Sequence, residues 1–104
     1  MAHAQIKSLN YEGEPLIEVR GHWDQSALDN LIRAFQKCLS KVNAILFLRL
    51  SELDYMDSAA MGVIMFNMRE LAKRNAKLVL LQPSTEMRDI LHTSSLDRIL
   101  EIRD

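Results

Sequence analysis

Two short segments in which every residue is apolar constrain the fold most strongly. They are Ala44–Leu48 and Leu78–Leu81, and a helical stretch over about residues 58–74 separates them. A strand that is apolar on both sides is typical of the middle of a sheet whose faces are covered by helices. Two such strands joined by a helix are parallel. The sequence therefore predicts an α/β domain.

Weaker patterns precede these strands. Segments 4–10 and 16–20 alternate between apolar and polar residues, and turn residues separate them, which predicts an antiparallel hairpin. Apolar residues spaced by three and four then predict a helix over about residues 26–41. Asp24 or Ser26 can cap that helix.

The last third of the chain continues the alternation of helices and strands. Asn75, which tolerates the left-handed conformation, marks the expected stop of the 58–74 helix. Pro83 opens a short helix over about 84–92, and residues 99–102 add an edge strand. We therefore expect one domain over residues 1–104, with a mixed sheet that begins with the hairpin and continues with parallel strands.

Charge and cysteine content argue against several classes of function. The 104 residues carry a formal net charge of -1, so there is no overall positive field to attract nucleic acid or an anionic membrane. The longest apolar runs fall far short of the roughly 20 residues that span a bilayer. The single Cys38 cannot form an internal disulfide, and the first residues do not resemble a signal peptide. We therefore expect a cytoplasmic protein that binds neither nucleic acid nor membranes.

The sequence offers no recognisable catalytic site. It contains neither a glycine-rich phosphate-binding motif nor a nucleophile elbow. His3, His22 and His92 are too scattered for a metal site, and Cys38 fits a small buried hydrophobe. We expect a protein that is not an enzyme and that holds no cofactor and no metal.

The segment after the first apolar strand combines an acidic loop, residues 51–57, with a helix rich in small residues. Two apolar stripes run along this helix at helical spacing. We expect the first stripe to face the core: Met61, Ile64, Met65, Met68, Leu71 and Ala72. The second is either buried by a neighbouring element or exposed as a docking face: Ala59, Gly62, Val63 and Phe66.

Ser58 stands at the start of this helix, and two interpretations of it remain open. Either Ser58 or the adjacent Asp57 caps the helix. Alternatively Ser58 accepts a phosphate, whose charge of about -1.5 to -2 the helix dipole would tolerate. Glu52 and Asp54 lie nearby, and no Lys or Arg occurs between residues 50 and 68. A phosphate would therefore act mainly on a bound partner, through repulsion and the cost of desolvation.

Three segments carry a family resemblance. Residues 48–64 (LRLSELDYMDSAAMGVI) resemble the motif D-L-S-x-V-x-[FY]-[ML]-D-S-[SA]-G-L-G. Residues 21–24 (GHWD) resemble a G-[ED]-L-D loop, and residues 94–100 (SSLDRIL) resemble a closing S-G-L-x-x-[IL]-[FL]. These are the motifs of STAS domains, specifically of the anti-sigma factor antagonist branch, so the chain resembles that family over nearly its whole length.

The resemblance implies a partner-switching protein whose phosphoacceptor is Ser58. The unphosphorylated domain would bind a serine-kinase or anti-sigma-type protein with an ATP-binding kinase fold, phosphorylation would release it, and a PP2C-type phosphatase would reset the switch. The alternative is a constitutive STAS scaffold subunit of a transporter or signalling assembly. A weak homodimer through Val63 and Phe66 is a further possibility. The implied partner-binding residues are Trp23, Asp24, Asp54, Asp57, Ala59, Gly62, Val63 and Phe66.

Several positions depart from the family pattern. Ala60 replaces the motif glycine, which predicts a stiffer helix start because the helix propensity of alanine is about 1 kcal/mol better. His22 and Trp23 replace an acidic-apolar pair, and Trp23 belongs either to the core or to an interface. Asn75 and Ser95 stand where glycine is common, and serine suits such a position less well.

Overall fold

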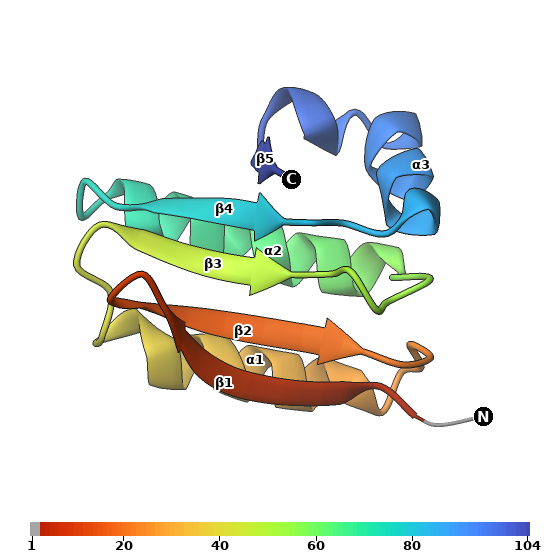
Figure 1. Cartoon of the computed structure of the whole chain (residues 1–104), viewed down its shortest axis with the longest axis horizontal. Coiled ribbons are helices and arrows are strands. Elements are labelled where there is room, and N and C mark those ends of the chain that lie inside the picture. Colours follow the sequence, from red (N-terminus) through yellow and green to blue (C-terminus); the bar gives the residue numbers. More distant parts are fainter. Residues whose placement is uncertain (1–2) are drawn as a thin grey trace.

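Five strands form one mixed sheet in the order β1-β2-β3-β4-β5 (Figure 1). The computed structural model describes residues 3–104. Strands β1 and β2 pair antiparallel and every later pair is parallel, which confirms the predicted fold class. The strands are β1 (Gln5–Tyr11), β2 (Glu14–Arg20), β3 (Ile45–Arg49), β4 (Lys77–Leu81) and β5 (Glu101–Arg103). The helices are α1 (Ala27–Leu39), α2 (Ser58–Ala72), α3 (Thr85–Thr93) and the short 3-10 turn η1 (Leu96–Arg98).

The local turns follow from residues that accept a positive φ. Glu12 and Gly13 form a two-residue hairpin loop, and both have positive φ, which suits the twist of the flanking strands. Asn75 has a φ of 58° just after α2, where the helix stop was predicted. Ser95 also has a left-handed φ, 62°, so the chain accepts serine where a glycine would cost less strain.

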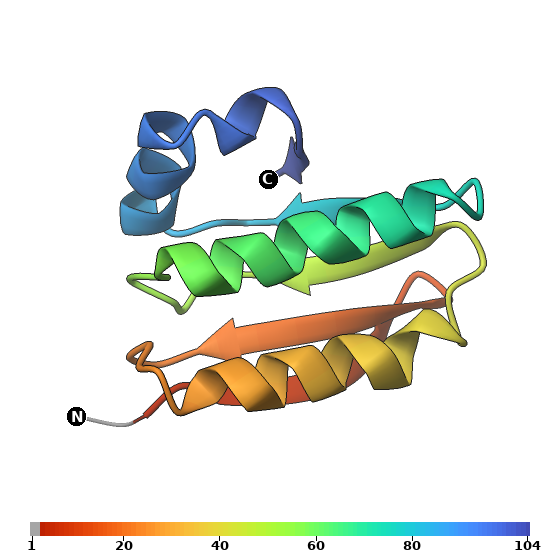
Figure 2. The ribbon, with the colours of Figure 1, turned by 180° about the vertical axis from the view of Figure 1, so that it is seen from behind.

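Helices α1 and α2 lie side by side on one face of the sheet, as Figures 1 and 2 show. The main core fills the space between them and the sheet, and many of its members are fully shielded from water. The expectation that helices cover both faces is wrong, because the opposite face carries no helix in the described residues (Figure 1). The largest fully buried side chains of the main core are Ile17, Leu31, Phe35, Leu46, Leu48, Leu50, Leu53, Met56, Ile64 and Leu71.

The uncovered face shields its apolar residues with long side chains instead of a helix. Leu16, Phe47, Val79 and Leu81 form a second small cluster there, each at most 4% exposed. The guanidinium of Arg103 lies 5.9 Å from the ring centroid of Phe47, within the range of a cation–π contact. The aliphatic stems of such side chains cover apolar surface while their charges stay in water, which explains why an all-apolar β3 needs a helix on one side only.

The main core gives a stability prediction. Leu80 in β4 is 0% exposed, whereas Leu9 on β1 is 42% exposed. Leu80→Ala should lower the free energy of unfolding by about 2–5 kcal/mol because it leaves a cavity in the core. The matched control Leu9→Ala should change it by less than about 0.5 kcal/mol. Urea unfolding followed by circular dichroism measures both, and equal losses would contradict the burial described here.

Candidate functional site

The loop between β3 and α2 is fixed by three buried side chains spaced three residues apart. Leu50, Leu53 and Met56 are at most 1% exposed. Ser84, at the start of α3, donates its backbone N–H to the Leu50 carbonyl at 3.2 Å and its hydroxyl to the Leu53 carbonyl. From the other side, the Gly21 N–H donates to the Glu52 carbonyl at 2.9 Å. The acidic loop is therefore held by its own apolar residues and by two neighbouring segments.

This anchoring delivers Asp57 and Ser58 to the start of α2 with separate tasks. Asp57 has extended backbone angles, and its Oδ1 accepts the Ala60 N–H at 2.9 Å, so it is the N-cap. Ser58 is the first helical residue and its side chain is exposed. Within residues 3–104 no hydrogen bond holds its hydroxyl. The interpretation of Ser58 as the cap is therefore wrong, and its hydroxyl is free for other chemistry.

The surroundings of Ser58 are acidic. Glu52 and Asp54 are exposed, and Asp57 is half-buried by its capping role. The nearest charge partner among the described residues is His22, whose Nδ1 lies 3.7 Å from Asp54 Oδ2. Among the described residues that line the hollow beside Ser58 there is no Lys or Arg, so no cation is in place there to pair with a phosphate.

The Asp24 loop lies beside this acidic loop, and the Gly21–Glu52 hydrogen bond and the His22–Asp54 contact connect the two. Asp24 accepts the Ser26 hydroxyl, the Ser26 N–H at 3.0 Å, and a bond from His3 Nδ1 at 2.5 Å. The bond from the Ser26 hydroxyl, followed by that from His3, lowers the pKa of Asp24. Ser26 occupies the cap position of α1, but its side chain makes no capping bond.

Trp23 is buried more deeply than the adjacent Asp24, which is half-buried. Its side chain is 3% exposed and belongs to the main core. The core alternative for Trp23 therefore holds, and in this conformation the residue offers no contact surface to a partner. Its large ring packs in the main core and so anchors the adjacent Asp24 loop to the domain.

Helix α2 buries a narrower face than the first apolar stripe predicts. Ala60, Ile64, Asn67 and Leu71 are its buried residues. Met61, Met65 and Met68 are half-buried, and the expectation that Ala72 faces the core is wrong because it is exposed. Asn67 satisfies its amide within the helix, since its Nδ2 donates to the Val63 carbonyl at 2.8 Å.

The second stripe of α2 is exposed and borders a groove of about 370 Å³ between α1 and α2. Ala59 and Gly62 are exposed, Val63 is half-buried, and Phe66 is 56% exposed. The neighbouring helix therefore does not bury this stripe. The sequence analysis did not identify the α1 side of the groove, which Ile32, Gln36 and Leu39 line.

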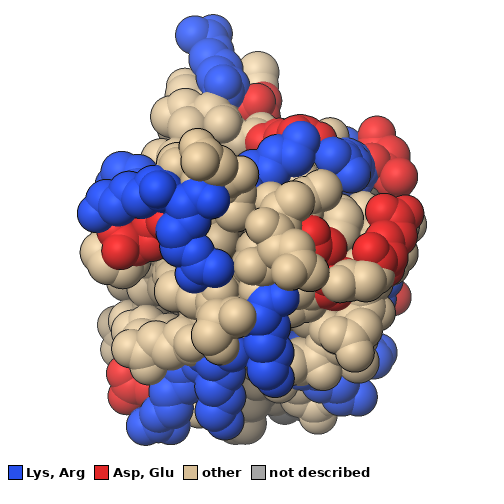
Figure 3. All heavy atoms as spheres, turned by 90° about the vertical axis from the view of Figure 1, so that its left-hand side faces the viewer, with Lys and Arg blue, Asp and Glu red and all other residues tan. Residues whose placement is uncertain are grey.

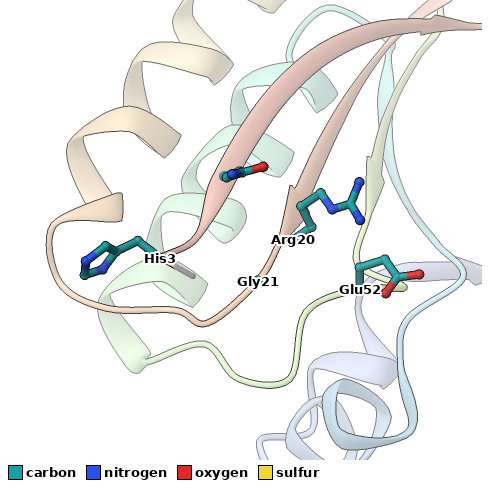
Figure 4. A pocket seen from close by; sticks show the side chains of 5 residues that line it. His3, Arg20, Gly21 and Glu52 are labelled. Carbon is teal, nitrogen blue, oxygen red and sulfur yellow. The ribbon is translucent and has the colours of Figure 1, made fainter. Parts of the chain in front are cut away.

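Two further hollows lie at the same end of the molecule. One, of about 350 Å³, borders Ser58 on its other side and runs between α2 and α3, with Tyr55, Met61 and Ile90 in its lining. The other, of about 470 Å³, lies between the start of β1, the end of β2 and Glu52. Figure 4 shows Arg20 and Glu52 extending on one side of it and His3 on the other. No residue of the predicted site lines this larger hollow.

Two negative findings concern residues 3–104. No described helix has the length and apolar character needed to cross a membrane. In the same part of the chain, no three His, Cys, Asp or Glu side chains are grouped so that they could hold a metal ion.

Comparison with known proteins identifies the family. The family model of the STAS domain matches residues 10–104, so this chain belongs to the STAS domain family. An anti-sigma factor antagonist from Mycobacterium paratuberculosis has a TM-score of 0.82 at 16% identity, over 95% of this chain and 84% of that one. No curated protein sequence matches.

Two structures of the anti-sigma factor antagonist SpoIIAA have the same fold. The unphosphorylated form has a TM-score of 0.79 at 20% identity, over 96% of this chain and 89% of that one. The phosphorylated form, described as a Bacillus cell fate determinant, has a TM-score of 0.70 at 22% identity, over 97% and 91%. At these identities the likeness establishes the shared fold.

The separate tasks of Asp57 and Ser58 give a direct prediction. Asp57→Ala should lower the free energy of unfolding by about 1 kcal/mol, because the first turn of α2 loses its cap. Ser58→Ala should change it by less than about 0.5 kcal/mol, because the hydroxyl bonds to nothing. Chemical unfolding of the two variants tests this, and a larger loss for Ser58→Ala would reverse the assignment of the cap.

The hydrogen bonds of Asp24 predict a pH effect. Its pKa in the folded protein lies below the ordinary value of about 3.9. The ionised carboxylate therefore contributes stability above that pH, and the contribution is lost as the pH falls through the folded pKa. Ser26→Ala should raise the pKa of Asp24, and His3→Gln should raise it less. Carboxyl ¹³C NMR titration measures both, and an unchanged pKa in Ser26→Ala would refute this cause.

Proposed function

We propose that this STAS domain is a phosphorylation switch of the anti-sigma factor antagonist type. In its unphosphorylated form it binds a serine-kinase or anti-sigma-type partner, and phosphorylation of Ser58 releases that partner. The domain itself binds and does not catalyse. The structures that share its fold support this proposal, because they are of anti-sigma factor antagonists and one of them is a phosphorylated form.

The observation that carries the proposal is the free, exposed hydroxyl of Ser58 at the first position of α2. Because Asp57 supplies the cap, a phosphate on Ser58 removes no hydrogen bond on which the helix depends. The helix N-terminus also tolerates the added negative charge. The modification can therefore occur on the folded domain.

The proposed docking surface begins at Ser58 and continues along the exposed stripe of α2. Ala59 and Gly62 permit close approach of a partner backbone, and Phe66 offers an aromatic side chain beside the α1–α2 groove. Asp54, Asp57 and Asp24 form its acidic margin. A phosphate at the Ser58 end of this surface would add about two negative charges. Binding of the partner would then be opposed by the cost of desolvating the phosphate and by repulsion from any negative charge on the partner.

The remaining parts of the cycle follow from the same proposal. The kinase partner transfers the phosphate to Ser58, and a PP2C-type phosphatase removes it. The cytoplasm is the proposed location, since the one cysteine, Cys38, is free and buried. The principal alternative is a constitutive STAS scaffold that uses the same helix without phosphorylation.

Ser58 variants test the switch. Mass spectrometry of the protein from its native cells should find a phosphate on Ser58 whose occupancy changes between growing and stressed cultures. With the kinase partner that Ser58→Ala captures, Ser58→Asp should bind at least about tenfold more weakly than wild type, through charge repulsion. Ser58→Ala should remain bound when ATP is added, whereas wild type is released.

Controls separate the switch from its alternatives. Ser40→Asp places the same charge on an exposed serine at the far end of α1 and should leave binding unchanged. Equal binding by wild type and Ser58→Asp would instead indicate the constitutive scaffold. A sedimentation coefficient that rises with protein concentration in the wild type, but not in Phe66→Ala, would indicate a homodimer through α2.

A further inference from the structure

Strand β1 leaves one long edge of the sheet open. It forms one end of the strand order, and within residues 3–104 no other strand pairs with its outer side. Its pairing with β2 is continuous over seven residues, without a bulge, and its sequence QIKSLNY contains no proline. Natural sheets usually protect such an edge by shortness, bulges, proline or charge. Lys7 is the one charged residue in this strand.

The cations around this edge have no charge partners. Lys7 stands opposite Glu18 on the open face of the sheet, but Glu18 is bound to Arg49 at 3.1 Å. Among the described ion pairs none involves Lys7, so its positive charge on the open face of the sheet is not neutralised within residues 3–104.

The helix side of β1 has the same character. Ile6 and Ser8 line a hollow of about 270 Å³ together with residues of α1, among them Arg33 and Lys37. Arg33 reaches only the side-chain oxygen of Asn30, at 3.5 Å, and neither cation forms an ion pair within the described part of the chain. Figure 3 shows Lys and Arg side chains along the lower edge of the molecule, where β1 and α1 lie in Figure 1. Cations therefore flank the open edge on both faces.

We propose that the open edge of β1 binds an extended acidic segment of a partner protein as a sixth strand. The backbone N–H and C=O groups of β1 supply the pairing. Successive side chains of an added strand point to opposite faces. Carboxylates on one face therefore meet Lys7, and those on the other meet Arg33 and Lys37. Leu9, which is 42% exposed, favours an apolar residue beside it.

Charge decides between this occupant and a second copy of the chain. Two β1 edges paired about a twofold axis would bring their α1 helices together, and with them the Arg33 and Lys37 side chains of both copies. Like charges held together in this way destabilise an interface. This surface is separate from α2 and requires no phosphate on Ser58.

A short peptide serves as the probe. Acetyl-Glu-Glu-Val-Glu-Glu-Val-Glu-amide should bind the unphosphorylated full chain at low ionic strength, and the same peptide with Gln for every Glu should not. Hydrogen exchange followed by NMR should show new protection at alternate amides of β1. Lys7→Glu combined with Arg33→Glu should weaken binding at least about tenfold, because both faces of the edge change sign.

The control variant carries the same total charge change elsewhere. Arg69→Glu with Arg98→Glu reverses two exposed cations on α2 and η1 and should change the affinity less than about twofold, since it leaves the edge intact. Equal weakening by both double variants, or binding without protection of β1, would overturn the proposal in favour of non-specific attraction. Protection of β1 that grows with protein concentration in the absence of peptide would overturn it in favour of a second copy.

Discussion

The burial of Leu50, Leu53 and Met56 is the constraint on which the functional end of this domain depends. A loop with three carboxylates has little reason to adopt one conformation in water. Here every third side chain is fixed in the core, and Ser84 bonds to the carbonyls of Leu50 and Leu53. The acidic residues between the anchors therefore face outward, and the chain enters α2 at a defined angle.

The low net charge of the chain conceals two surfaces of opposite character. The loops that follow β2 and β3 present carboxylates around the start of α2. The edge formed by β1 and α1 presents cations that no carboxylate of the described chain neutralises. Opposite charges placed on separate surfaces select different partners, because each surface attracts one sign and repels the other. The two proposed interfaces therefore lie on separate surfaces, and partners bound to them would not compete for the same residues.

The sequence was sufficient for the order of helices and strands along the chain and for the mixed character of the sheet, because both depend on local patterns. All-apolar strands and residues that accept positive φ, such as Asn75, indicate where these elements lie. The covering of the sheet was predicted wrongly, because an all-apolar strand does not reveal whether a helix or arginine stems shield it. The choice between Asp57 and Ser58 as cap was also open, since both residue types cap helices well. Only the backbone geometry separates them.

The spacing of apolar residues in the sequence also did not predict burial where burial depends on a neighbouring helix or strand. Trp23 and Phe66 are both large aromatics near the proposed site, yet one is in the core and the other is 56% exposed. The position of α1 decides how much of α2 remains open, and the sequence of α2 contains no information about that position. The α1 side of the groove, Ile32 and Leu39, was hidden for the same reason.

The cap at Asp57 determines what a modification of Ser58 would change in this domain. A residue that both caps a helix and accepts a phosphate would couple every modification to partial loss of the helix. If Ser58 is the phosphoacceptor, as proposed, the two tasks are on adjacent residues, so a group added to Ser58 would change the surface potential without removing the cap. The unphosphorylated and phosphorylated forms would then have similar free energies of unfolding. The speed of exchange between them would depend on encounter with the modifying enzymes, with no delay for refolding.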